Sequence, residues 1–356
     1  TVSVRNTLTG ETYAENYDNL ILSPGAEPIK PAIPGIGSPR VFTLSNIPDT
    51  LKIKSFIDTQ KPKSVAVVGG GYIGVEMAEA MLRLGRQVTL LEAGERILAP
   101  FEPEFSELAA QELERHGVRV IVGGAVSEIR ELGEKRLIRT RQGNVEADVV
   151  VVAAGVAPDT GFLRDTGVRM ARNGALLVDR EMRTSLEDIY AAGDCAVVYH
   201  RLMEEDYFIP LGTVANKCGR LAGANMAGGR QKFAGALGTA AIKVCELEMG
   251  RTGLSEADAR RLGLEYKTRL VTAYDHPAYY PDPVKLTIKL IYQARTRRLL
   301  GACVAGGRNA VLRADVFAVA IHSGMTTDEL GMLDLAYAPP FAGVWDAVHI
   351  AANAAK

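Results

Sequence analysis

The chain has 356 residues, of which 47% are hydrophobic and 23% are charged, and this composition is typical of a globular protein. Its length exceeds what one compact core accommodates, so two or three domains are expected. Lysine and arginine (41) nearly balance aspartate and glutamate (42), so the net charge of −1 gives no long-range attraction for nucleic acid or an anionic membrane.

The expected partners are therefore small molecules and copies of the chain itself. No apolar run is long enough to cross a bilayer and no signal peptide is recognisable, so we expect a cytoplasmic protein. The four cysteines show no CxxC spacing, which predicts neither a metal site nor a disulfide framework.

The first residue is Thr1, and the chain opens inside a predicted strand–turn–strand in which Val2–Arg5 and Leu20–Leu22 flank a turn at Thr9–Glu11. Because this opening is abrupt, we expect further sequence upstream.

The first unit ends within residues 17–37, where a buried strand runs into a turn at Ser23–Gly25 and then a proline-rich connector. A helix is predicted after Asn46. Val65–Val68 is a short, wholly apolar run, which is typical of a parallel strand covered on both faces. A second helix follows, and its expected buried stripe consists of Ile73, Met77, Met81 and Leu84.

Helices and strands continue to alternate towards the middle of the chain. The elements predicted there are a strand at 88–91, a helix at 103–116, a strand at 118–122, a polar hairpin near 139–142, a buried strand at 147–154, a strand–turn–strand at 176–194 and a helix at 213–227. Beyond Gly238 the pattern favours an antiparallel sheet with helices packed on it. Its predicted strands are 239–244, 266–272, 285–292 and 299–304, and its helices are 309–323 and 327–332.

A glycine-rich turn joins the strand at 65–68 to the following helix. Gly69, Gly71 and Gly74 satisfy the GxGxxG pattern of dinucleotide-binding proteins. The first glycine permits a tight turn, the second lets backbone approach a pyrophosphate, and the third lets the helix pack close to the strand. The helix N-terminus offers free N–H groups and a positive dipole end to the phosphates. GxGxxG alone is weak evidence, and the alternative is a glycine turn that serves packing only.

Glu92 makes the dinucleotide interpretation specific, because it ends the next strand and follows Gly74 by 18 residues. An acid at this place accepts hydrogen bonds from an adenosine ribose and repels a 2′-phosphate. We therefore expect NADH to be favoured over NADPH, although Arg96 nearby weakens that preference.

A second motif runs from Thr184 to Asp194 (TSLEDIYAAGD). It resembles the second flavin signature of the pyridine nucleotide-disulfide oxidoreductase family. Two further stretches are similar to that family: Leu22–Ala26 resembles its ATG segment, with Ser-Pro in place of Ala-Thr, and Gly155–Pro158 resembles its GxxP turn. The resemblance implies that Asp194 holds the ribityl and pyrophosphate region of FAD and that Gly193 lets backbone approach it.

The resemblance implies an α/β fold with two Rossmann-like nucleotide-binding domains, the FAD domain incomplete, and a C-terminal α+β dimerisation domain. The expected division is a remnant of the FAD domain at 1–45, an NAD(P)-binding domain at 46–158, the second FAD segment at 159–232 and the interface domain at 233–356. The family's first GxGxxG and its redox cysteine would lie upstream of Thr1. Cys195, next to Asp194, is interpreted as a small buried residue and not as that cysteine.

The C-terminal part resembles a subgroup, the coenzyme A-disulfide reductases with related NADH oxidases and persulfide reductases. Leu333–Phe341 (LDLAYAPPF) and His276–Pro281 (HPAYYP) carry this resemblance. In the reductases, tyrosines at such positions come from both subunits and line the disulfide pocket. Tyr280 and Tyr337 are therefore our catalytic candidates, since a phenol can give a proton to a leaving thiolate. The alternative is that both tyrosines merely pack an interface.

The implied reaction is a hydride relay from NADH through the flavin to a disulfide or persulfide of coenzyme A, in a homodimer. The resemblance gives Tyr72 a gating role over the nicotinamide and places Glu76 beside it. Without the upstream cysteine, the chain alone is expected to be inactive. The residues expected to bind NAD(P)H are Gly69, Gly71, Tyr72, Ile73, Gly74, Glu76, Glu92 and Gly155, and those expected to bind FAD are Gly25, Gly193, Asp194 and Thr213.

Other interpretations remain open. The same cofactor motifs serve an NADH oxidase or peroxidase that uses oxygen or peroxide. A non-catalytic, nucleotide-binding redox sensor is an alternative from a different functional class. The flavin signature that ends at Asp194 argues against this alternative, because a sensor of NAD alone needs no flavin site. Arg308 and Arg313 either contact coenzyme A phosphates or lie on a solvated helix face, and the solvated face is favoured.

Overall fold

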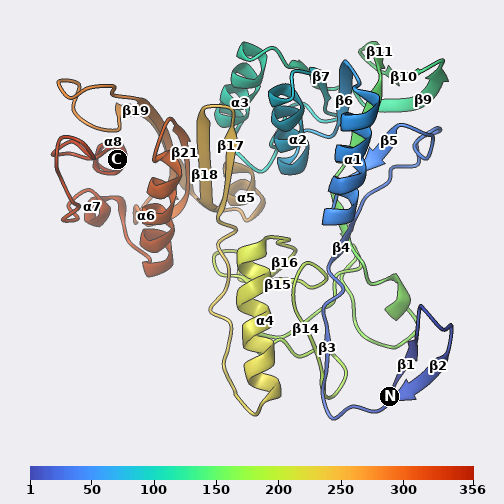
Figure 1. The fold of residues 1–356 in the computed structure, drawn as a ribbon. Coiled ribbons are helices and arrows are strands. Elements are labelled where there is room, and N and C mark those ends of the chain that lie inside the picture. Colours follow the sequence, from blue (N-terminus) through green and yellow to red (C-terminus); the bar gives the residue numbers. More distant parts are fainter. The chain divides into compact units, whose positions relative to one another are not determined.

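The computed structural model describes residues 1–356, which form two compact units (Figure 1). The first unit combines residues 1–27 with 157–236, and the second combines 28–156 with 237–356. Two short strands, β4 (Ala26–Pro28) and β13 (Val156–Pro158), lie where the chain passes from one unit to the other. None of the helices has both the length and the apolar composition that a bilayer-spanning segment needs.

The first unit opens with a hairpin. β1 (Val2–Arg5) pairs antiparallel with β2 (Thr12–Glu15). The predicted strands Val2–Arg5 and Leu20–Leu22 are both present, but the prediction missed β2, which follows the turn at Gly10 directly. β3 (Leu20–Leu22) pairs in parallel with β14 (Ile189–Ala191), so segments far apart in sequence lie side by side.

The rest of the first unit is short strands and one long helix. The predicted strand at Leu176 is absent: Leu176 forms only isolated bridges, because repeated turns keep a ladder from extending. The helix α4 (Gly212–Met226) packs its apolar side against the core of this unit. The remaining elements are the 3₁₀ turn Gly161–Leu163, β15 (Val198–His200) and β16 (Glu205–Tyr207).

The second unit contains a five-stranded parallel sheet in the order β5-β12-β6-β7-β8. The central strands β6 and β12 are buried on both faces, which is why their sequences are almost wholly apolar. The bounds of the strands are β5 Val41–Thr43, β6 Ser64–Val68, β7 Gln87–Leu91, β8 Arg119–Ile121 and β12 Val149–Val152. The predicted alternation of helices and strands is confirmed in this region.

Different elements cover the two faces of the parallel sheet. On one face, Val65 and Val67 of β6 share a core with α1 (Ile47–Gln60), α2 (Tyr72–Arg83) and α3 (Pro103–Arg115). On the other face, Ala66 and Val68 pack against a three-stranded antiparallel sheet in the order β11-β10-β9. The bounds of that sheet are β9 Val126–Leu132, β10 Lys135–Thr140 and β11 Gly143–Ala147.

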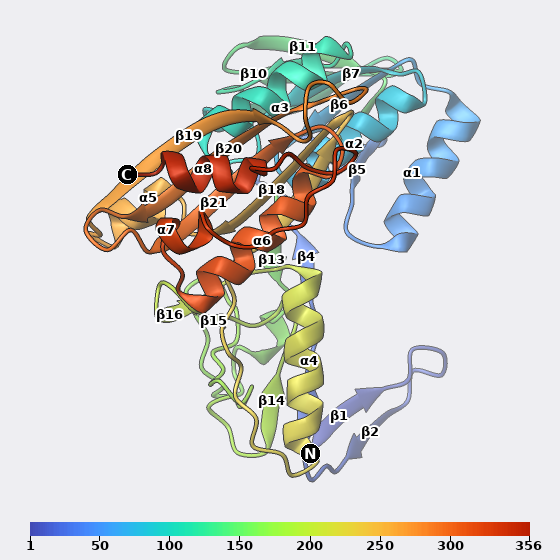
Figure 2. The same ribbon diagram turned by 90° about the vertical axis from the view of Figure 1, so that its left-hand side faces the viewer.

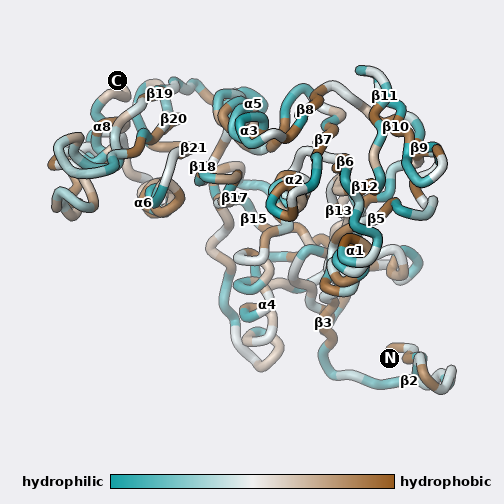
Figure 3. Tube along the Cα trace, turned by 45° about the horizontal axis from the view of Figure 1, so that its top comes forward, coloured by the Kyte–Doolittle hydropathy of each residue, from teal (hydrophilic) through white to brown (hydrophobic).

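The helix α2 carries both hydrophobic and hydrophilic residues (Figure 3), and its buried side differs in part from the predicted stripe. Met77 and Met81 are buried as expected. Leu84 is 54% exposed, because the helix ends at Arg83 and Leu84 lies beyond its last turn. Val75 and Ala78, which are fully buried, complete the contact with the core.

The C-terminal half of the second unit is a five-stranded antiparallel sheet in the order β17-β18-β21-β20-β19. The helices α6 and α8 lie against one side of this sheet and α2 and α3 against the other (Figures 1 and 2). The bounds are β17 Ala240–Val244, β18 Leu247–Gly253, α5 Glu256–Arg261, β19 Tyr266–Tyr274, β20 Lys285–Gln293, β21 Leu299–Gly306, α6 Ala310–Ser323, α7 Thr327–Leu330 and α8 Ala347–Ala354.

A buried ion cluster ties this sheet to the nucleotide-binding half of the same unit. The ammonium of Lys289 on β20 lies 2.9 Å from Glu102 and 2.8 Å from Glu104 at the start of α3, and it also pairs with Glu256 on α5. Burial opposes the charge of Lys289, but hydrogen bonds to the three carboxylates outweigh it and raise the pKa of Lys289. Any arrangement that separates Lys289 from these carboxylates would leave uncompensated charge in the protein interior. The cluster therefore holds the two halves of the unit in one arrangement.

Candidate functional site

The glycine turn in the second unit has the geometry of a dinucleotide site. Gly69 has a φ of 114°, and a Cβ there would lie 2.1 Å from the carbonyl oxygen of Ala153. A Cβ on Gly74 would lie 1.8 Å from the carbonyl oxygen of Gly69, so helix and turn touch backbone to backbone. Both positions require glycine because the protein itself fills the space.

Gly71 is different, because a Cβ at this position would meet nothing within 4 Å. Gly71 is also the N-cap of α2, with no side chain capping the helix and no acidic residue in its first turn. The first N–H groups of α2 are thus left without intrahelical partners beside an open space, which fits a pyrophosphate. Ile73, in the first turn, is half-buried.

Glu92 follows β7 and lies against this turn. Its Oε2 accepts a hydrogen bond from the Gly70 N–H at 2.6 Å, and its Oε1 accepts one from the Gly94 N–H at 2.6 Å. These two bonds fix the carboxylate, and each oxygen keeps a second lone pair for a ribose hydroxyl. The structure therefore brings together Gly69, Gly71, Gly74 and Glu92, as the sequence predicts.

Tyr72 and Glu76 continue along α2. Tyr72 is half-buried, and its ring lies 6.0 Å from that of Phe101. Burial raises the pKa of Tyr72 to about 12, an effect that Arg251 partly opposes. Glu76 is exposed, and partial desolvation together with the nearby charge of Glu79 raises its pKa. Tyr72 therefore keeps its proton at neutral pH.

Gly155 follows the buried strand β12 and has a φ of 103°. Its carbonyl oxygen accepts a hydrogen bond from the Ile29 N–H at 2.9 Å. A Cβ here would lie 3.6 Å from the Ile29 side chain, so the requirement for glycine is conformational and not a matter of space.

The first unit brings the three sequence stretches of the expected flavin site together. The parallel pairing of β3 with β14 places Ser23 beside Gly193, and the Ser23 hydroxyl donates a 2.8 Å hydrogen bond to the Ala192 carbonyl. Gly25, with a φ of 78°, has open space where a Cβ would be. Thr213 is exposed in the first turn of α4, and the adjacent Val214 packs in the same core as Ala191 and Ala192.

Asp194 is the most informative residue of this group. Its Oδ1 is buried and accepts no hydrogen bond from the protein. Burial raises the pKa of Asp194, since nothing compensates the charged form. A buried, unpartnered carboxylate oxygen is costly, and a ligand hydroxyl that donates to it removes that cost. The residue fits the ribityl-binding role implied by the family resemblance.

The four cysteines are all buried and free. Burial raises the pKa of each of them, and at Cys195 the neighbouring charge of Asp194 adds to this effect. A thiol must ionise to act as a nucleophile, so none of the four is suited to that role. The interpretation of Cys195 as a small buried residue agrees with its exposure of 0%.

The catalytic candidates Tyr280 and Tyr337 lie on two surface segments of the C-terminal half, and the structure adds Tyr279. The hydroxyls of Tyr279 and Tyr337 are 3.5 Å apart, and Tyr280 packs edge-on against His276 with ring centroids 5.6 Å apart. All three tyrosines are exposed. The hydrogen bond with Tyr337 raises the pKa of Tyr279. Tyr279 was not among the predicted site residues, although it is adjacent to Tyr280.

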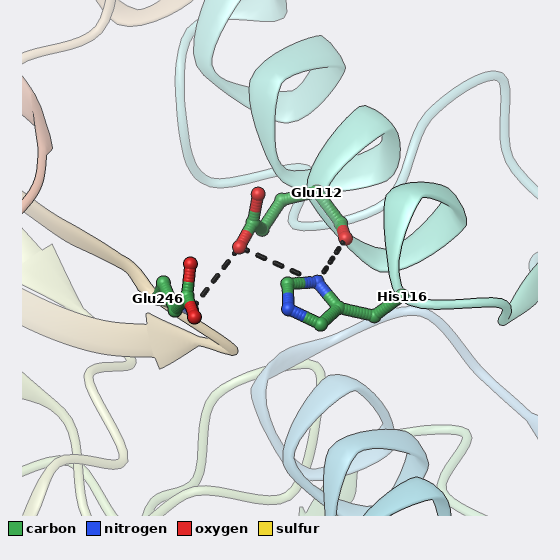
Figure 4. Close-up of side chains that lie close together, drawn as sticks. All are labelled: Glu112, His116 and Glu246. Carbon is green, nitrogen blue, oxygen red and sulfur yellow. Dashed lines mark hydrogen bonds and ion pairs between the residues drawn. The ribbon is translucent and has the colours of Figure 1, made fainter.

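One cluster has the residue types of a metal site: Glu112, His116 and Glu246 converge where α3 meets the β17–β18 turn (Figure 4). Arg115, however, lies 2.9 Å from the Glu112 carboxylate and 2.8 Å from that of Glu246. Burial opposes ionisation of Glu112, but hydrogen bonds from Arg115 and the Glu246 N–H outweigh it and lower the pKa. Because Arg115 already compensates both carboxylates, the cluster acts as an ionic contact between α3 and the sheet.

Comparison with known families gives two matches. Residues 1–216 match the model described as pyridine nucleotide-disulphide oxidoreductase. Residues 239–348 match the dimerisation domain of the same family.

Individual relatives and structures are similar over nearly the whole chain. A protein of Pyrococcus horikoshii named NAD(P)H coenzyme A polysulfide/persulfide reductase is 36% identical, over 99% of this chain and 79% of its own. The structure of reduced Bacillus anthracis CoADR-RHD superposes with a TM-score of 0.95 at 36% identity, over 99% of this chain but only 64% of that one. The water-forming NADH oxidase from Lactobacillus brevis, bound to NADH, gives a TM-score of 0.95 at 30% identity, over 99% of this chain and 78% of that one.

Proposed function

The chain belongs to the pyridine nucleotide-disulphide oxidoreductase family, and from this premise we propose that it forms the NAD(P)H- and FAD-binding part of a reductase of coenzyme A disulfides or persulfides. The relative of Pyrococcus horikoshii, similar over 99% of the chain, supports this substrate class. The observation that carries the proposal is the presence of two different nucleotide-type sites, the open turn at Gly71 and the unpartnered carboxylate oxygen of Asp194.

The residues of the second unit would bind and orient the nicotinamide nucleotide. The free N–H groups of α2 and the open side of Gly71 accommodate the pyrophosphate, and the fixed Glu92 carboxylate accepts the ribose hydroxyls. Gly69, Gly74 and Gly155 maintain the backbone around this site. Tyr72, Ile73 and Glu76 line the first turns of α2, where the nicotinamide end would lie.

The residues of the first unit would hold the flavin, which, when bound, accepts hydride from the nicotinamide and passes electrons to sulfur. Asp194 would accept a hydrogen bond from a hydroxyl of the ribityl chain at its buried Oδ1. Gly25 leaves open space for a ligand, whereas a Cβ on Gly193 would lie 3.4 Å from the Ser23 hydroxyl oxygen, so Gly193 is needed for its φ of 94°. Thr213 lies at the N-terminus of α4, where a phosphate is favoured.

Tyrosines would provide the proton that a leaving thiolate needs. An ordinary phenol has a pKa of about 10, so it remains protonated at neutral pH and donates to a developing thiolate. In the Tyr279–Tyr337 pair, the shared hydrogen bond raises the pKa of Tyr279 further. We assign proton donation or substrate orientation to Tyr280 and Tyr337, with Tyr279 as the hydrogen-bond partner of Tyr337.

The match of residues 239–348 to a dimerisation domain supports a homodimer. In such a dimer the exposed tyrosine segments of one subunit would complete the site of the other. Their exposure in a single chain is consistent with this role, since Tyr279 is 75% exposed and Tyr337 48% exposed.

A second function, oxidation of NADH by oxygen, is favoured by one observation. The Lactobacillus brevis NADH oxidase covers 99% of the chain at a TM-score of 0.95. The nucleotide sites serve both reactions, so the two functions differ in the electron acceptor and in the need for the tyrosines.

The test uses the protein expressed from its complete gene and purified with FAD, under anaerobic conditions, because the sulfur reaction needs a thiol nucleophile and none of the four cysteines described here is suited to that role. NADH is expected to bleach the yellow flavin absorbance, and coenzyme A disulfide or persulfide is then expected to restore it. Restoration by oxygen but not by the sulfur compounds would favour the oxidase, and a flavin that stays yellow would exclude both.

A pair of tyrosine variants tests the proton donor. Tyr337→Phe is expected to slow reoxidation by the sulfur substrate roughly 100-fold, within the usual range for general acid catalysis. Tyr13→Phe is the matched control, because Tyr13 is also 48% exposed but lies in the N-terminal hairpin. Equal rates for the two variants would remove Tyr337 from the mechanism.

A further inference from the structure

Arg313 on α6 is buried, with an exposure of 8%, so it does not lie on a solvated helix face. The favoured sequence interpretation of this residue is therefore wrong. A helix residue facing inward needs partners for its charge, and Arg313 finds them on two segments that are distant from it in sequence.

The first partner of Arg313 is Asp346, at the end of the segment that carries Tyr337. The Arg313 Nε donates to the Asp346 carboxylate at 3.1 Å and its Nη2 at 2.7 Å, which is the two-pronged geometry of a guanidinium on a carboxylate. Asp346 is also the N-cap of α8, since its Oδ1 accepts the Val348 N–H at 2.8 Å. Arg313 thereby fixes the point where the Tyr337 segment enters α8.

The second partner of Arg313 is Asp275, at the base of the loop that carries Tyr279 and Tyr280. The same Nη2 donates to the backbone carbonyl of Asp275 at 2.9 Å. The Asp275 carboxylate accepts the Val284 N–H at 2.9 Å, which closes the base of the loop.

His276 stiffens the loop from inside. Its Nδ1 lies 2.8 Å from the Asp275 carboxylate and its Nε2 lies 3.0 Å from the Pro281 carbonyl. The ring that makes these two contacts is the one on which Tyr280 packs edge-on. The position of Tyr280 therefore depends on Asp275 through His276.

The other end of the Tyr337 segment is also tied down. The Nε2 of His349 on α8 lies 2.8 Å from the Leu333 carbonyl, and its Nδ1 accepts the Asp346 N–H at 3.2 Å. Both ends of residues 333–346 thus meet at the start of α8. The residues of this network are buried, while Tyr279, Tyr280 and Tyr337 at the tips are exposed.

We propose that Arg313 is a positioning residue, which holds the loop 275–284 and the segment 333–346 in one arrangement and so sets the places of Tyr279, Tyr280 and Tyr337. The catalytic meaning of this arrangement rests on the proposed function. The arrangement itself rests on the contacts of Arg313 with Asp346 and Asp275.

Arginine is needed because one planar group must bind two segments at once. Nε and Nη2 serve the Asp346 carboxylate while the second hydrogen of Nη2 serves the Asp275 carbonyl. Lysine keeps the charge, which the buried Asp346 requires, but it provides a point charge without the fork. The substitution Arg313→Lys therefore separates the positioning role from simple charge compensation.

The experiment incorporates 3-fluorotyrosine into the chain and follows its ¹⁹F NMR signals, which Tyr279→Phe, Tyr280→Phe and Tyr337→Phe assign. In Arg313→Lys the signals of these three tyrosines are expected to shift or broaden, while the other tyrosine signals and the cooperative thermal transition remain. Arg297→Lys is the matched control, because Arg297 also pairs with an aspartate, Asp328, in the C-terminal half but is 41% exposed. This control is expected to leave all tyrosine signals in place.

Asp346→Asn provides an independent variant that keeps an N-cap side chain on α8 and removes its charge. It is expected to move the Tyr337 signal more than the Tyr280 signal, since the contact with Asp275 remains. Unchanged signals of all three tyrosines in both variants would overturn the proposal. A lowered melting temperature with unmoved tyrosine signals would also overturn it, because it would show a purely structural role.

Kinetics then test the link to catalysis. Arg313→Lys is expected to slow reoxidation of the reduced flavin by the sulfur substrate roughly 10- to 100-fold, the usual cost of displaced groups, and to leave reduction by NADH unchanged. A loss of both half-reactions would contradict positioning. If the wild-type protein, expressed from its complete gene and with FAD bound, reduces no sulfur compound, the proposed function fails, and the ¹⁹F result still decides the role of Arg313.

Discussion

The two nucleotide-type sites differ in how they satisfy their acidic residue. Glu92 in the second unit has both carboxylate oxygens bound by backbone N–H groups, each at 2.6 Å. Asp194 in the first unit has a buried oxygen with no hydrogen-bond partner, and burial raises its pKa. One site is completed by the protein, whereas the other is left for a ligand to complete.

This difference determines which of the two carboxylates stabilises the folded chain and which destabilises it. A carboxylate bound by backbone donors stabilises the fold around it, and its removal leaves those donors unpaired. A buried carboxylate without donors destabilises the fold until a ligand arrives. We therefore expect substitutions at the two acids to change stability in opposite directions.

The largest effect is expected for Gly69→Ala. A Cβ would lie 2.1 Å from the Ala153 carbonyl oxygen, and the φ of 114° is unfavourable for alanine. The expected cost is about 2–4 kcal/mol of unfolding free energy, with loss of NADH binding. Chemical denaturation and calorimetric titration measure the two effects.

Gly71→Ala is the control for this prediction. A Cβ there meets no protein atom within 4 Å, so stability should fall only by about 1 kcal/mol or less, the cost of alanine at an N-cap, while NADH binding weakens. A Gly71→Ala variant destabilised as much as Gly69→Ala, or one that binds NADH normally, would contradict the role of Gly71 as the open side of the site.

The next largest effect is expected for Glu92→Gln. The amide accepts only one of the two N–H bonds that Glu92 now accepts, and its NH₂ group faces the other donor, so stability should fall by about 1–3 kcal/mol. Loss of the negative charge should also reduce the preference for NADH over NADPH. Denaturation curves and binding titrations with both coenzymes check this, with the exposed neighbour Glu95→Gln as control. A variant as stable as the parent chain would show that the two bonds add nothing.

A smaller effect of opposite sign is expected for Asp194→Asn. Removing the charge from a buried, unpartnered group should leave the chain without flavin equally stable or more stable, by about 1 kcal/mol or less. Flavin affinity should fall at least tenfold in the same variant, because one hydrogen bond to a charged carboxylate is lost. The exposed Asp165 in the same unit provides the control substitution Asp165→Asn. Loss of stability without loss of flavin would make Asp194 a structural residue.

The smallest effect concerns pH. Since the pKa of Asp194 is raised in the folded chain, the folded state binds a proton that the unfolded state has released. The unfolding free energy of the chain without flavin should therefore decrease as pH rises from the ordinary aspartate pKa through the raised one. The difference between the parent chain and Asp194→Asn, measured by denaturation at several pH values, isolates this contribution. A constant difference across that range would show that Asp194 titrates normally.

Much of the fold could be predicted because the patterns are local. The apolar run at β6 and the glycines after it indicate a buried parallel strand and a tight turn before any contact is known. The sequence does not predict the strand β18 (Leu247–Gly253), because its glycines and charged residues are not typical of a strand with neighbours on both sides. Its Gly250 has a tertiary purpose: a Cβ there would lie 2.7 Å from the Ala314 side chain of α6.

The roles of the charged residues were harder to predict. Arg313 and Lys289 have the sequence context of solvated side chains, yet both are buried. Lys289 meets Glu102 across 187 residues of sequence, and Arg313 meets Asp346 across 33. No local pattern marks such pairs, since only the packing of whole elements brings the partners together.

The sequence by itself determined the turn from Gly69 to Gly74, the acidic residues Glu92 and Asp194 that follow β7 and β14, and the family to which these motifs belong. Backbone sterics and short spacings along the chain govern these features. The tertiary structure decided that Glu92 is satisfied while Asp194 is not, and that Arg313 joins two tyrosine segments. These outcomes depend on which donors lie within about 3 Å of a carboxylate in the folded chain, and that distance is set by the packing of distant elements.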